Sequence, residues 1–258
     1  QGGCRWAMNS TDGAPQNYPC LSASLYYGSP GIALFFGTLA RAAGDEQWNA
    51  LAASALDHAV ETLNETIAAF GPNPGFYYGL LGVAYGLRAS GGSTARHRAA
   101  AAAIETYVLT SARPLAPASA SATLWNNTDV AHGIAGAGLY LLWAARHGGT
   151  RDVGSLVRAA DWLISVAEPT SDGGLRWYRG ADTDGRHAGQ YFPTFCCGTT
   201  GVSFFLATLA QELPRLEGEP HASARLLDAA KRGAAHAIAE ARTVDSMLLL
   251  PHEDEGAG

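Results

Sequence analysis

A short glycine motif, G-x-x-G followed by apolar residues, occurs four times along the chain and constrains its fold more than any other feature. The four copies read Y-Y-G-S-P-G-I-A-L-F-F at 26–36, Y-Y-G-L-L-G-V-A-Y-G-L at 77–87, A-H-G-I-A-G-A-G-L-Y-L at 131–141 and C-C-G-T-T-G-V-S-F-F-L at 196–206. Their first glycines are 51, 54 and 65 residues apart. A motif that recurs at such steps indicates a protein built from repeated supersecondary units.

Each copy is expected to start an α-helix. Glycine permits a tight turn and a close backbone approach, and the apolar residues that follow it have helical spacing. These first helices are almost free of charge except at their ends, so we expect them to be buried on most sides. They are predicted at 32–42, 83–89, 134–146 and 202–213.

A second, amphipathic helix follows the break after each first helix. The clearest runs from about 46 to 66, with an apolar stripe that includes Ala52, Ala55 and Leu56. In the third repeat the stripe comprises Val153, Leu156, Val157, Ala160 and Leu163, and in the fourth it comprises Leu226, Leu227, Ala230 and Ile238. The connecting segments 114–130 and 168–195 have no helical period and are predicted to contain short β-hairpins.

The repeating unit is therefore a helical hairpin of about 50 residues that begins with a G-x-x-G loop. First helices ringed by second helices describe an all-α fold, an α/α toroid or an arc of one. Hydrophobic residues make up 47% of the chain, enough for one core, and we predict a single domain over residues 1–258.

Charge and cysteine content exclude several classes of protein. A net charge of −6 argues against nucleic acid or an anionic membrane as partner, because both require clustered Lys and Arg. No apolar run approaches the roughly 20 residues of a membrane span. The four cysteines, Cys4, Cys20, Cys196 and Cys197, are too few for a disulfide framework, so reduced thiols and a cytoplasmic location are expected.

The four motifs resemble those of the lanthionine synthetase C-like (LanC-like) family of peptide cyclases. The residues that carry the resemblance are Tyr27-Gly-Ser-Pro-Gly-Ile, Tyr78-Gly-Leu-Leu-Gly-Val, Asp129-Val-Ala-His-Gly-Ile-Ala-Gly and Phe195-Cys-Cys-Gly-Thr-Thr-Gly-Val. The resemblance implies a toroid of seven helical hairpins whose G-x-x-G loops gather around the active site. It also implies addition of a Cys thiol to dehydroalanine or dehydrobutyrine, with a zinc ion that activates the thiol.

The chain departs from the family pattern in its metal ligands. Four of the seven repeats are recognised, and the family's zinc ligands belong to later W-C-x-G and C-H-G loops. We therefore expect a partial toroid, with a LanC-like cyclase as its function, in which this chain alone binds no stoichiometric zinc and cyclises no peptide unaided. Two apolar edges would stay open, which predicts an oligomer or further C-terminal repeats.

Three residues are candidates for catalysis. Asp129 falls on an acidic active-site position of the family, although an Asx turn or helix N-cap is an equally good interpretation. His132 directly precedes Gly133. It is a candidate acid or base, and a purely structural role is the alternative. Cys197 stands where the family usually has a His.

The remaining residues of interest have weaker signals. An alternative alignment places Cys196-Cys197-Gly on the zinc-binding C-H-G loop, but repeat order argues against it. Cys196 is more simply interpreted as a small buried hydrophobe. Tyr27 and Tyr78 precede two of the loops and are candidate substrate-binding residues, with packing as the alternative.

Two other functions compete with the cyclase. The first is a non-catalytic module that binds a peptide or glutathione. The second is an (α/α)₆ glycoside hydrolase, which would need Asp129 to work with Asp12 or Glu253 across a cleft and leaves the G-x-x-G loops unexplained. For the leading hypothesis the partner is a dehydrated peptide or a small thiol.

Overall fold

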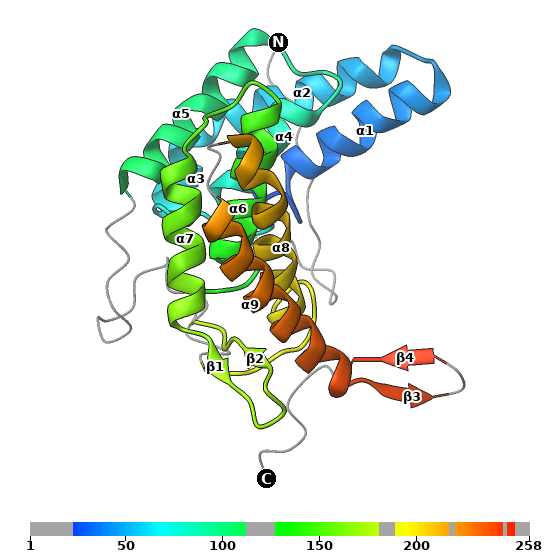
Figure 1. Ribbon diagram of the computed structural model, residues 1–258. Coiled ribbons are helices and arrows are strands. Elements are labelled where there is room, and N and C mark those ends of the chain that lie inside the picture. Colours follow the sequence, from blue (N-terminus) through cyan, green and yellow to red (C-terminus); the bar gives the residue numbers. More distant parts are fainter. Residues whose placement is uncertain (1–22, 112–126, 181–188, 217–219, 245–246, 251–258) are drawn as a thin grey trace. The chain divides into compact units, whose positions relative to one another are not determined.

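The computed structural model describes residues 23–111, 127–180, 189–216, 220–244 and 247–250 (Figure 1). Their contacts divide the chain into two compact units, 1–111 and 112–258. Each unit is described by itself, and a single domain over the whole chain stays a prediction. The described residues are mainly helical, which confirms the all-α fold class.

The first unit contains two helical hairpins. Helices α1 and α2 pack together, α4 packs on α5, and α1 also contacts α4 (Figure 1). The helices are α1 (Ser29–Ala43), α2 (Gln47–Glu61), α3 (Leu63–Phe70), α4 (Leu80–Ala89) and α5 (Ala95–Ser111). The predicted stop after α1 is confirmed, since Gly44 adopts the left-handed conformation (φ 65°) and donates its N–H to the Ala40 carbonyl.

The second unit repeats the plan and adds two small antiparallel sheets. Helix α6 packs on α7, α8 packs on α9, and α6 also contacts α8. The helices are α6 (Ile134–Arg146), α7 (Val153–Ser165), α8 (Thr199–Leu216) and α9 (Pro220–Ala239). Strands β1 (Glu168–Pro169) and β2 (Leu175–Arg176) form a hairpin, and so do β3 (Arg242–Val244) and β4 (Met247–Leu249). The first hairpin lies where one was predicted, whereas the second was not anticipated.

A recurring backbone joint explains the G-x-x-G motif. Each first helix begins directly after the first glycine of its motif, three residues earlier than predicted in three of the four copies. In three copies the first helical amide donates to a carbonyl seven residues back, each time at 2.9 Å: Leu80 to Asn73, Ile134 to Asn127 and Thr199 to Phe192. The preceding loop thereby satisfies one of the amides that a helix N-terminus leaves unpaired.

Glycine is required at this joint for space rather than for an unusual backbone conformation. Gly79 and Gly133 have φ values of −134° and −120°, which any residue can adopt. A Cβ on Gly133 would lie 2.2 Å from the Asn127 carbonyl oxygen, and one on Gly198 would lie 1.6 Å from that of Phe192. The close approach predicted from the motif is thus present, but a tight turn that only glycine could make is not.

The first helices differ in how completely they are buried. Helices α4 and α6 are buried on most sides, as predicted. The prediction is wrong for one face of α1 and of α8, where Phe35 is 62% exposed and Phe204 is 51% exposed. These faces lack a neighbouring helix among the described residues of their own units.

The second helices confirm the predicted stripes with two corrections. Ala52, Ala55 and Leu56 of α2 are buried, and so is most of the α7 stripe. In α9 Leu226 and Ala230 are buried, whereas Leu227 and Ile238 are exposed because they lie outside the face that packs on α8. The helix predicted over 46–66 is divided at Thr62 into α2 and α3, and α8 continues through Pro214.

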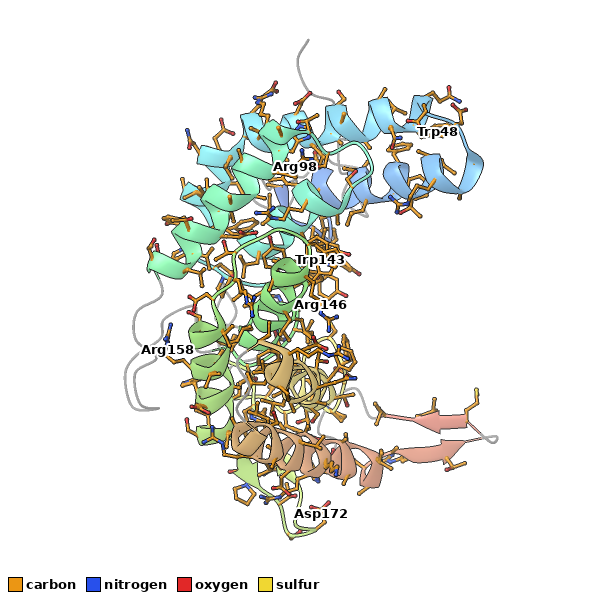
Figure 2. All side chains as sticks on the ribbon, turned by 45° about the horizontal axis from the view of Figure 1, so that its top comes forward. Trp48, Arg98, Trp143, Arg146, Arg158 and Asp172 are labelled. Atoms are coloured by element: carbon orange, nitrogen blue, oxygen red, sulfur yellow. The ribbon has the colours of Figure 1, made fainter. Side chains whose placement is uncertain are left out.

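Ion pairs connect the helices within each unit. In the first unit Arg88 at the end of α4 meets Glu105 of α5, with Nε 2.8 Å from Oε1 and both side chains nearly inaccessible. In the second unit Arg146, labelled in Figure 2, pairs with Glu212 of α8. A basic residue in the last turn of a helix also complements the negative end of its dipole. Within the described residues, no helix combines the length and the apolar character needed to cross a membrane.

Candidate functional site

The loop that leads into α6 presents a buried carboxylate. Asp129 is fully buried, and its Oδ1 accepts a 2.7 Å hydrogen bond from the backbone N–H of His132. Its backbone carbonyl accepts from the N–H of Gly136 in the first turn of α6. Asp129 therefore makes the Asx-type turn considered from the sequence, and its Oδ2 remains available for a second partner.

That second partner is Arg179, which the sequence analysis missed. The Arg179 Nε lies 2.8 Å from Asp129 Oδ2, and the Arg179 side chain is only 5% exposed. Its Nη2 lies 3.0 Å from His132 Nδ1. One guanidinium thus contacts both predicted catalytic residues of this loop. No sequence motif marks Arg179, and the only signal is a basic residue within the aromatic stretch Trp177-Tyr178-Arg179.

The position of Arg179 is set by backbone pairing. Its N–H donates to the Gln190 carbonyl at 3.0 Å, and its carbonyl accepts from the N–H of Gly189 at 2.9 Å. Next to it, the Tyr178 carbonyl accepts from Thr128 Oγ1 at 3.0 Å, which ties this segment to the Asp129 loop. The guanidinium carbon also lies 5.6 Å from the centre of the Phe192 ring.

The contact with Arg179 defines the tautomer of His132. A guanidinium has only donors, so His132 Nδ1 accepts in the shorter contact with Arg179 (3.0 Å), and the same nitrogen lies 3.4 Å from Asp129 Oδ2. When Nδ1 accepts, Nε2 carries the ring hydrogen. The imidazole is partly accessible, with 23% of its side chain exposed. His132 therefore presents an N–H donor to a ligand at this site.

The cysteine pair lies beside the same loop. The Cys196 carbonyl accepts hydrogen bonds from the N–H groups of Val130 (3.2 Å) and Ala131 (3.0 Å). Cys196 is exposed and Cys197 is half-buried, so the predicted burial of Cys196 is wrong. Cys196 lies at the surface because the chain turns into α8 directly after it. The Thr199 N–H donates to the Phe192 carbonyl, and Gly198 packs closely against the Phe192 backbone.

The two adjacent thiols differ in how readily they ionise. Hydrogen bonding from the Cys197 thiol is the main reason why the pKa of Cys196 is lowered to about 7, against burial and Asp129, which act in the opposite direction. His132 and Arg179 also favour the Cys196 thiolate. The same hydrogen bond, together with burial, raises the pKa of Cys197 well above its usual value. Cys196 is therefore the more readily ionised thiol of the pair.

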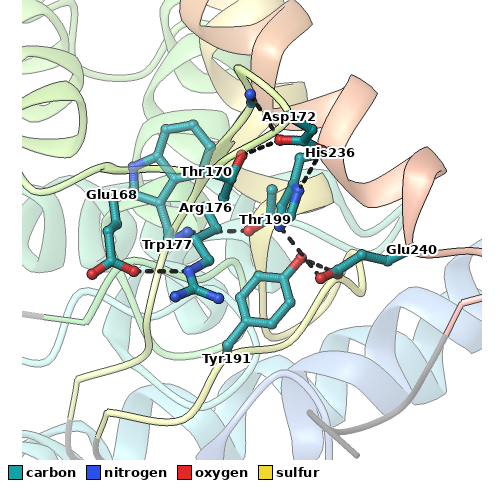
Figure 3. A network of polar contacts seen from close by, with 10 residues as sticks. Glu168, Thr170, Asp172, Arg176, Trp177, Tyr191, Thr199, His236 and Glu240 are labelled. Atoms are coloured by element: carbon teal, nitrogen blue, oxygen red, sulfur yellow. Dashed lines mark hydrogen bonds and ion pairs between the residues drawn. The ribbon is translucent and has the colours of Figure 1, made fainter. Parts of the chain in front are cut away.

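A polar network on the far side of this segment holds it against α9 (Figure 3). Tyr191, which forms a β-bridge with Tyr178, donates its hydroxyl to Glu240 Oε2 at 2.6 Å. His236 Nδ1 lies 3.0 Å from Asp172 Oδ2 at the tip of the β1–β2 hairpin. Burial and the Glu240 carboxylate raise the pKa of Tyr191, so this hydroxyl stays a neutral donor. The network supports the segment on which Arg179 lies.

The candidate substrate-binding tyrosines lie in the first unit. The rings of Tyr27 and Tyr78 are 5.8 Å apart, and both pack on Tyr26 at 4.6 and 5.3 Å. Tyr26, Tyr27 and Tyr77 line a cavity of about 490 Å³ together with Phe35 and Phe36. None of the described residues that line this cavity is charged, so it fits an apolar or aromatic group.

The structure brings together the three predicted catalytic residues. Asp129, His132 and Cys197 lie in one cluster of the second unit, to which Arg179 and Cys196 are added. In the described part of the chain, no three His, Cys, Asp or Glu side chains are placed to share a metal ion. This cluster therefore does not fit the zinc site that the family resemblance implies. Asp12 and Glu253, the carboxylates considered for a glycosidase, lie outside the described residues.

Comparison with known proteins agrees with this picture. A solved structure of nisin cyclase is similar to this chain with a TM-score of 0.61 and 20% sequence identity, over 86% of this chain. The chain spans 59% of the length of that nisin cyclase chain. At this identity the likeness shows the α/α-toroid fold alone. No curated protein matches the sequence significantly.

The sequence itself matches one family. The family described as "Lanthionine synthetase C-like protein" matches residues 19–177, which is more than half of the chain and includes the first three G-x-x-G motifs, Asp129 and His132. Given this match and the toroid fold, the chain belongs to the lanthionine synthetase C-like protein family.

Proposed function

We propose that this chain acts in thioether formation on a dehydrated peptide, and that the cluster of Asp129, His132 and Arg179 binds the dehydroalanine or dehydrobutyrine acceptor. One observation carries the proposal: Arg179 contacts both Asp129 and His132 beside an accessible pair of thiols. Family membership and the nisin cyclase fold support it.

The chemistry of the reaction explains why such a cluster is useful. When a thiolate adds to the β-carbon of dehydroalanine, negative charge develops on the neighbouring carbonyl oxygen. A donor already oriented towards that oxygen lowers the barrier, because it need not reorganise during the reaction. In our proposal the Nε2–H of His132 is this donor.

Asp129 and Arg179 have positioning roles in this proposal. Asp129 holds the backbone of His132 through Oδ1 and the Arg179 side chain through Oδ2. Arg179 in turn keeps a hydrogen-bond donor against His132 Nδ1, which maintains the Nε2–H tautomer. The buried carboxylate is thus a support for the donor and not itself the proton donor.

Activation of the attacking thiol is a separate requirement. In the complete family, by resemblance, zinc lowers the pKa of the substrate thiol. The described residues do not assemble a set of ligands for it, so we propose no step through the metal. We expect the purified 258-residue chain to hold no stoichiometric zinc and to bind the dehydrated peptide without cyclising it unaided.

The test separates acceptor activation from thiol activation. At about pH 9 a simple thiol with a pKa of about 8.5 is already largely ionised, so its addition to a dehydrated peptide needs no metal. We expect the chain to accelerate this addition, and His132→Ala to remove about 100-fold of the acceleration. The matched control is Asp161→Asn, which alters an exposed carboxylate on α7 and should leave the rate unchanged.

Two results would contradict the proposed function. One is a chain that does not accelerate the addition over buffer alone. The other is a His132→Ala variant with the wild-type rate and a wild-type circular dichroism spectrum. Metal analysis of the same preparation tests the zinc expectation, since one tightly held ion per chain would show that ligands are present after all.

A second role follows from the aromatic cavity of the first unit. We propose that Tyr27 and Tyr78 belong to a binding surface for apolar or aromatic side chains of the peptide, because the described residues that line the adjoining cavity are all uncharged. Replacing Tyr27 with Ala should weaken binding of the peptide without changing the addition rate at saturating peptide. This outcome would also hold for a module that binds peptides without catalysis.

A further inference from the structure

Successive repeats are joined by the same backbone hydrogen bond in both units. The donor is the N–H of the residue two positions before the first glycine of a motif, and the acceptor is the carbonyl of the equivalent residue in the next repeat. In the first unit Tyr26 donates to Tyr77 at 3.2 Å. In the second unit Ala131 donates to Cys196 at 3.0 Å. The bond has a direction, because the earlier repeat supplies the N–H at both junctions.

A side-chain contact accompanies this hydrogen bond at both junctions. The residue three positions before the first glycine packs on the second glycine of the next motif, as a knob in a hole. A Cβ on Gly82 would lie 2.9 Å from the Cβ of Leu25. One on Gly201 would lie 2.6 Å from Cγ2 of Val130. Leu25 and Val130 are both buried, so the second glycine leaves room for the knob of the preceding repeat.

The first and the fourth repeats each carry one half of this contact without the other. Phe195 stands at the knob position of the fourth repeat, yet its side chain is 42% exposed. Gly31 is the second glycine of the first repeat, and a Cβ there would meet only the Leu25 carbonyl of its own loop among the described groups beyond its own helix and chain neighbours. Within the described residues, nothing accepts from the Cys196 N–H or donates to the Tyr26 carbonyl.

The surfaces around the unused knob and the unused hole are both apolar. Gly31 and Ile32 line the cavity of about 490 Å³ in the first unit, whose described lining residues are uncharged. Phe35 also lines it and is 62% exposed. On the fourth repeat the Phe195 ring lies 5.5 Å from that of Phe204, which is 51% exposed. An aromatic knob therefore stands on one repeat and an open cavity that suits a phenyl ring on another.

We propose that a second copy of this chain joins the two halves, with Phe195 of one copy in the cavity beside Gly31 of the next. The Cys196 N–H of the first copy then donates to the Tyr26 carbonyl of the second. This contact continues an interface that the chain already makes at two junctions, and each copy brings both the knob and the cavity. Because knob and cavity are different surfaces, the interface is heterologous and copies add head to tail.

This inference goes beyond the proposed function, and the two meet at the cavity. The peptide side chains proposed to bind beside Tyr27 would use the space that Phe195 of another copy fills. A bound peptide and a neighbouring copy therefore exclude each other at this position. This competition alone rests on the proposed function, whereas the association itself does not.

The experiment is sedimentation velocity of the 258-residue chain and of two variants that each lack one half of the contact. Phe195→Ala removes the knob and keeps the cavity, whereas Ile32→Trp fills the cavity and keeps the knob. We expect the wild type to associate as its concentration rises, and each variant alone to have a dissociation constant at least about 30-fold higher, the effect typical of a buried aromatic anchor. An equimolar mixture of the two variants should form dimers, since one copy supplies the knob and the other the cavity.

The matched control is Leu227→Ala, which shortens an exposed side chain of α9 away from the contact and should leave association unchanged. Circular dichroism melts show whether each variant is folded. A wild-type chain that stays monomeric would leave Phe195 to another occupant, such as a following repeat, and would overturn the second copy. Folded variants that associate as the wild type does, or that stay monomeric when mixed, would overturn the contact between Phe195 and the cavity.

A dehydrated peptide added to the associated wild type separates this inference from the proposed function. Dissociation by the peptide is the expected result. A peptide that binds without dissociating the copies contradicts the peptide role of the cavity and leaves the head-to-tail contact standing. A chain that binds the peptide but never associates has the opposite meaning.

Discussion

Arg179 and Asp129 form a buried ion pair that joins two separate segments of the second unit. The Nε of Arg179 lies 2.8 Å from Asp129 Oδ2, and the two side chains are 5% and 0% exposed. Because the same guanidinium reaches His132, the pair determines how the imidazole is presented. The stability of the site and its chemistry therefore depend on one contact.

Removing the arginine should be costly. Arg179→Met would leave the Asp129 carboxylate buried without its cation, and we expect a loss of about 3–5 kcal/mol in the free energy of unfolding. Urea denaturation followed by circular dichroism measures this loss. The matched control is Arg225→Met, which breaks an ion pair with Asp161 whose side chains are about half exposed, and it should cost less than about 1 kcal/mol. Similar losses for the two variants would contradict a structural role for the buried pair.

The close backbone approach at Gly133 predicts that even one added methyl group will disturb the loop before α6. Gly133→Ala would place a Cβ 2.2 Å from the Asn127 carbonyl oxygen, so the Asp129 loop must move and both stability and peptide binding should fall. Gly154→Ala in α7 is the control, since its Cβ would meet the flexible end of Arg158 at 3.2 Å and Asp152 Oδ1 at an ordinary contact distance of 3.6 Å. It should be neutral or stabilise the chain by up to about 1 kcal/mol. The melting temperatures of both variants test this prediction. A Gly133→Ala variant as stable as the wild type would contradict the close approach at this joint.

The network around Asp172 should make stability depend on acid pH. Hydrogen bonding from Thr170 is the main reason why the pKa of Asp172 is held well below its usual 3.8, with His236 and the Gly174 N–H assisting. A lowered folded-state pKa stabilises the chain above the unfolded-state pKa, and this contribution is lost as the pH falls through the folded-state value. The stability difference between the wild type and Asp172→Asn should thus be constant at neutral pH and shrink steadily below about pH 4. Urea denaturation at a series of pH values measures it, and a difference that persists unchanged into strong acid would count against the network.

Exposed aromatic side chains on the first helices should promote association. Phe35 and Phe204 are both more than half exposed, each next to a second ring, Phe36 and Phe195 respectively. We expect the 258-residue chain to form oligomers as its concentration rises, and Phe35→Ser with Phe204→Ser to reduce them. Sedimentation velocity resolves the species, with Thr38→Ser on the exposed side of α1 as the control. A wild-type chain that stays monomeric at all concentrations would contradict this prediction.

Much of the fold could be predicted because its determinants are local. The G-x-x-G motif marks a joint between a helix start and a carbonyl only seven residues earlier, so the helices after Gly79, Gly133 and Gly198 follow from the sequence. The stripes of α2 and α7 follow from helical periodicity in the same way. Asp129 and His132 were accessible for the same reason, because both sit within one loop of this joint.

Tertiary structure alone decided the partners of these residues. Arg179 reaches Asp129 only because its backbone pairs with Gln190 and Tyr178 receives a hydrogen bond from Thr128, contacts between segments that no local pattern connects. The exposure of Cys196 likewise depends on where the loop before α8 meets the loop before α6. Local backbone geometry is encoded in neighbouring residues, whereas the side-chain partners of Asp129 and His132 come from a distant part of the chain.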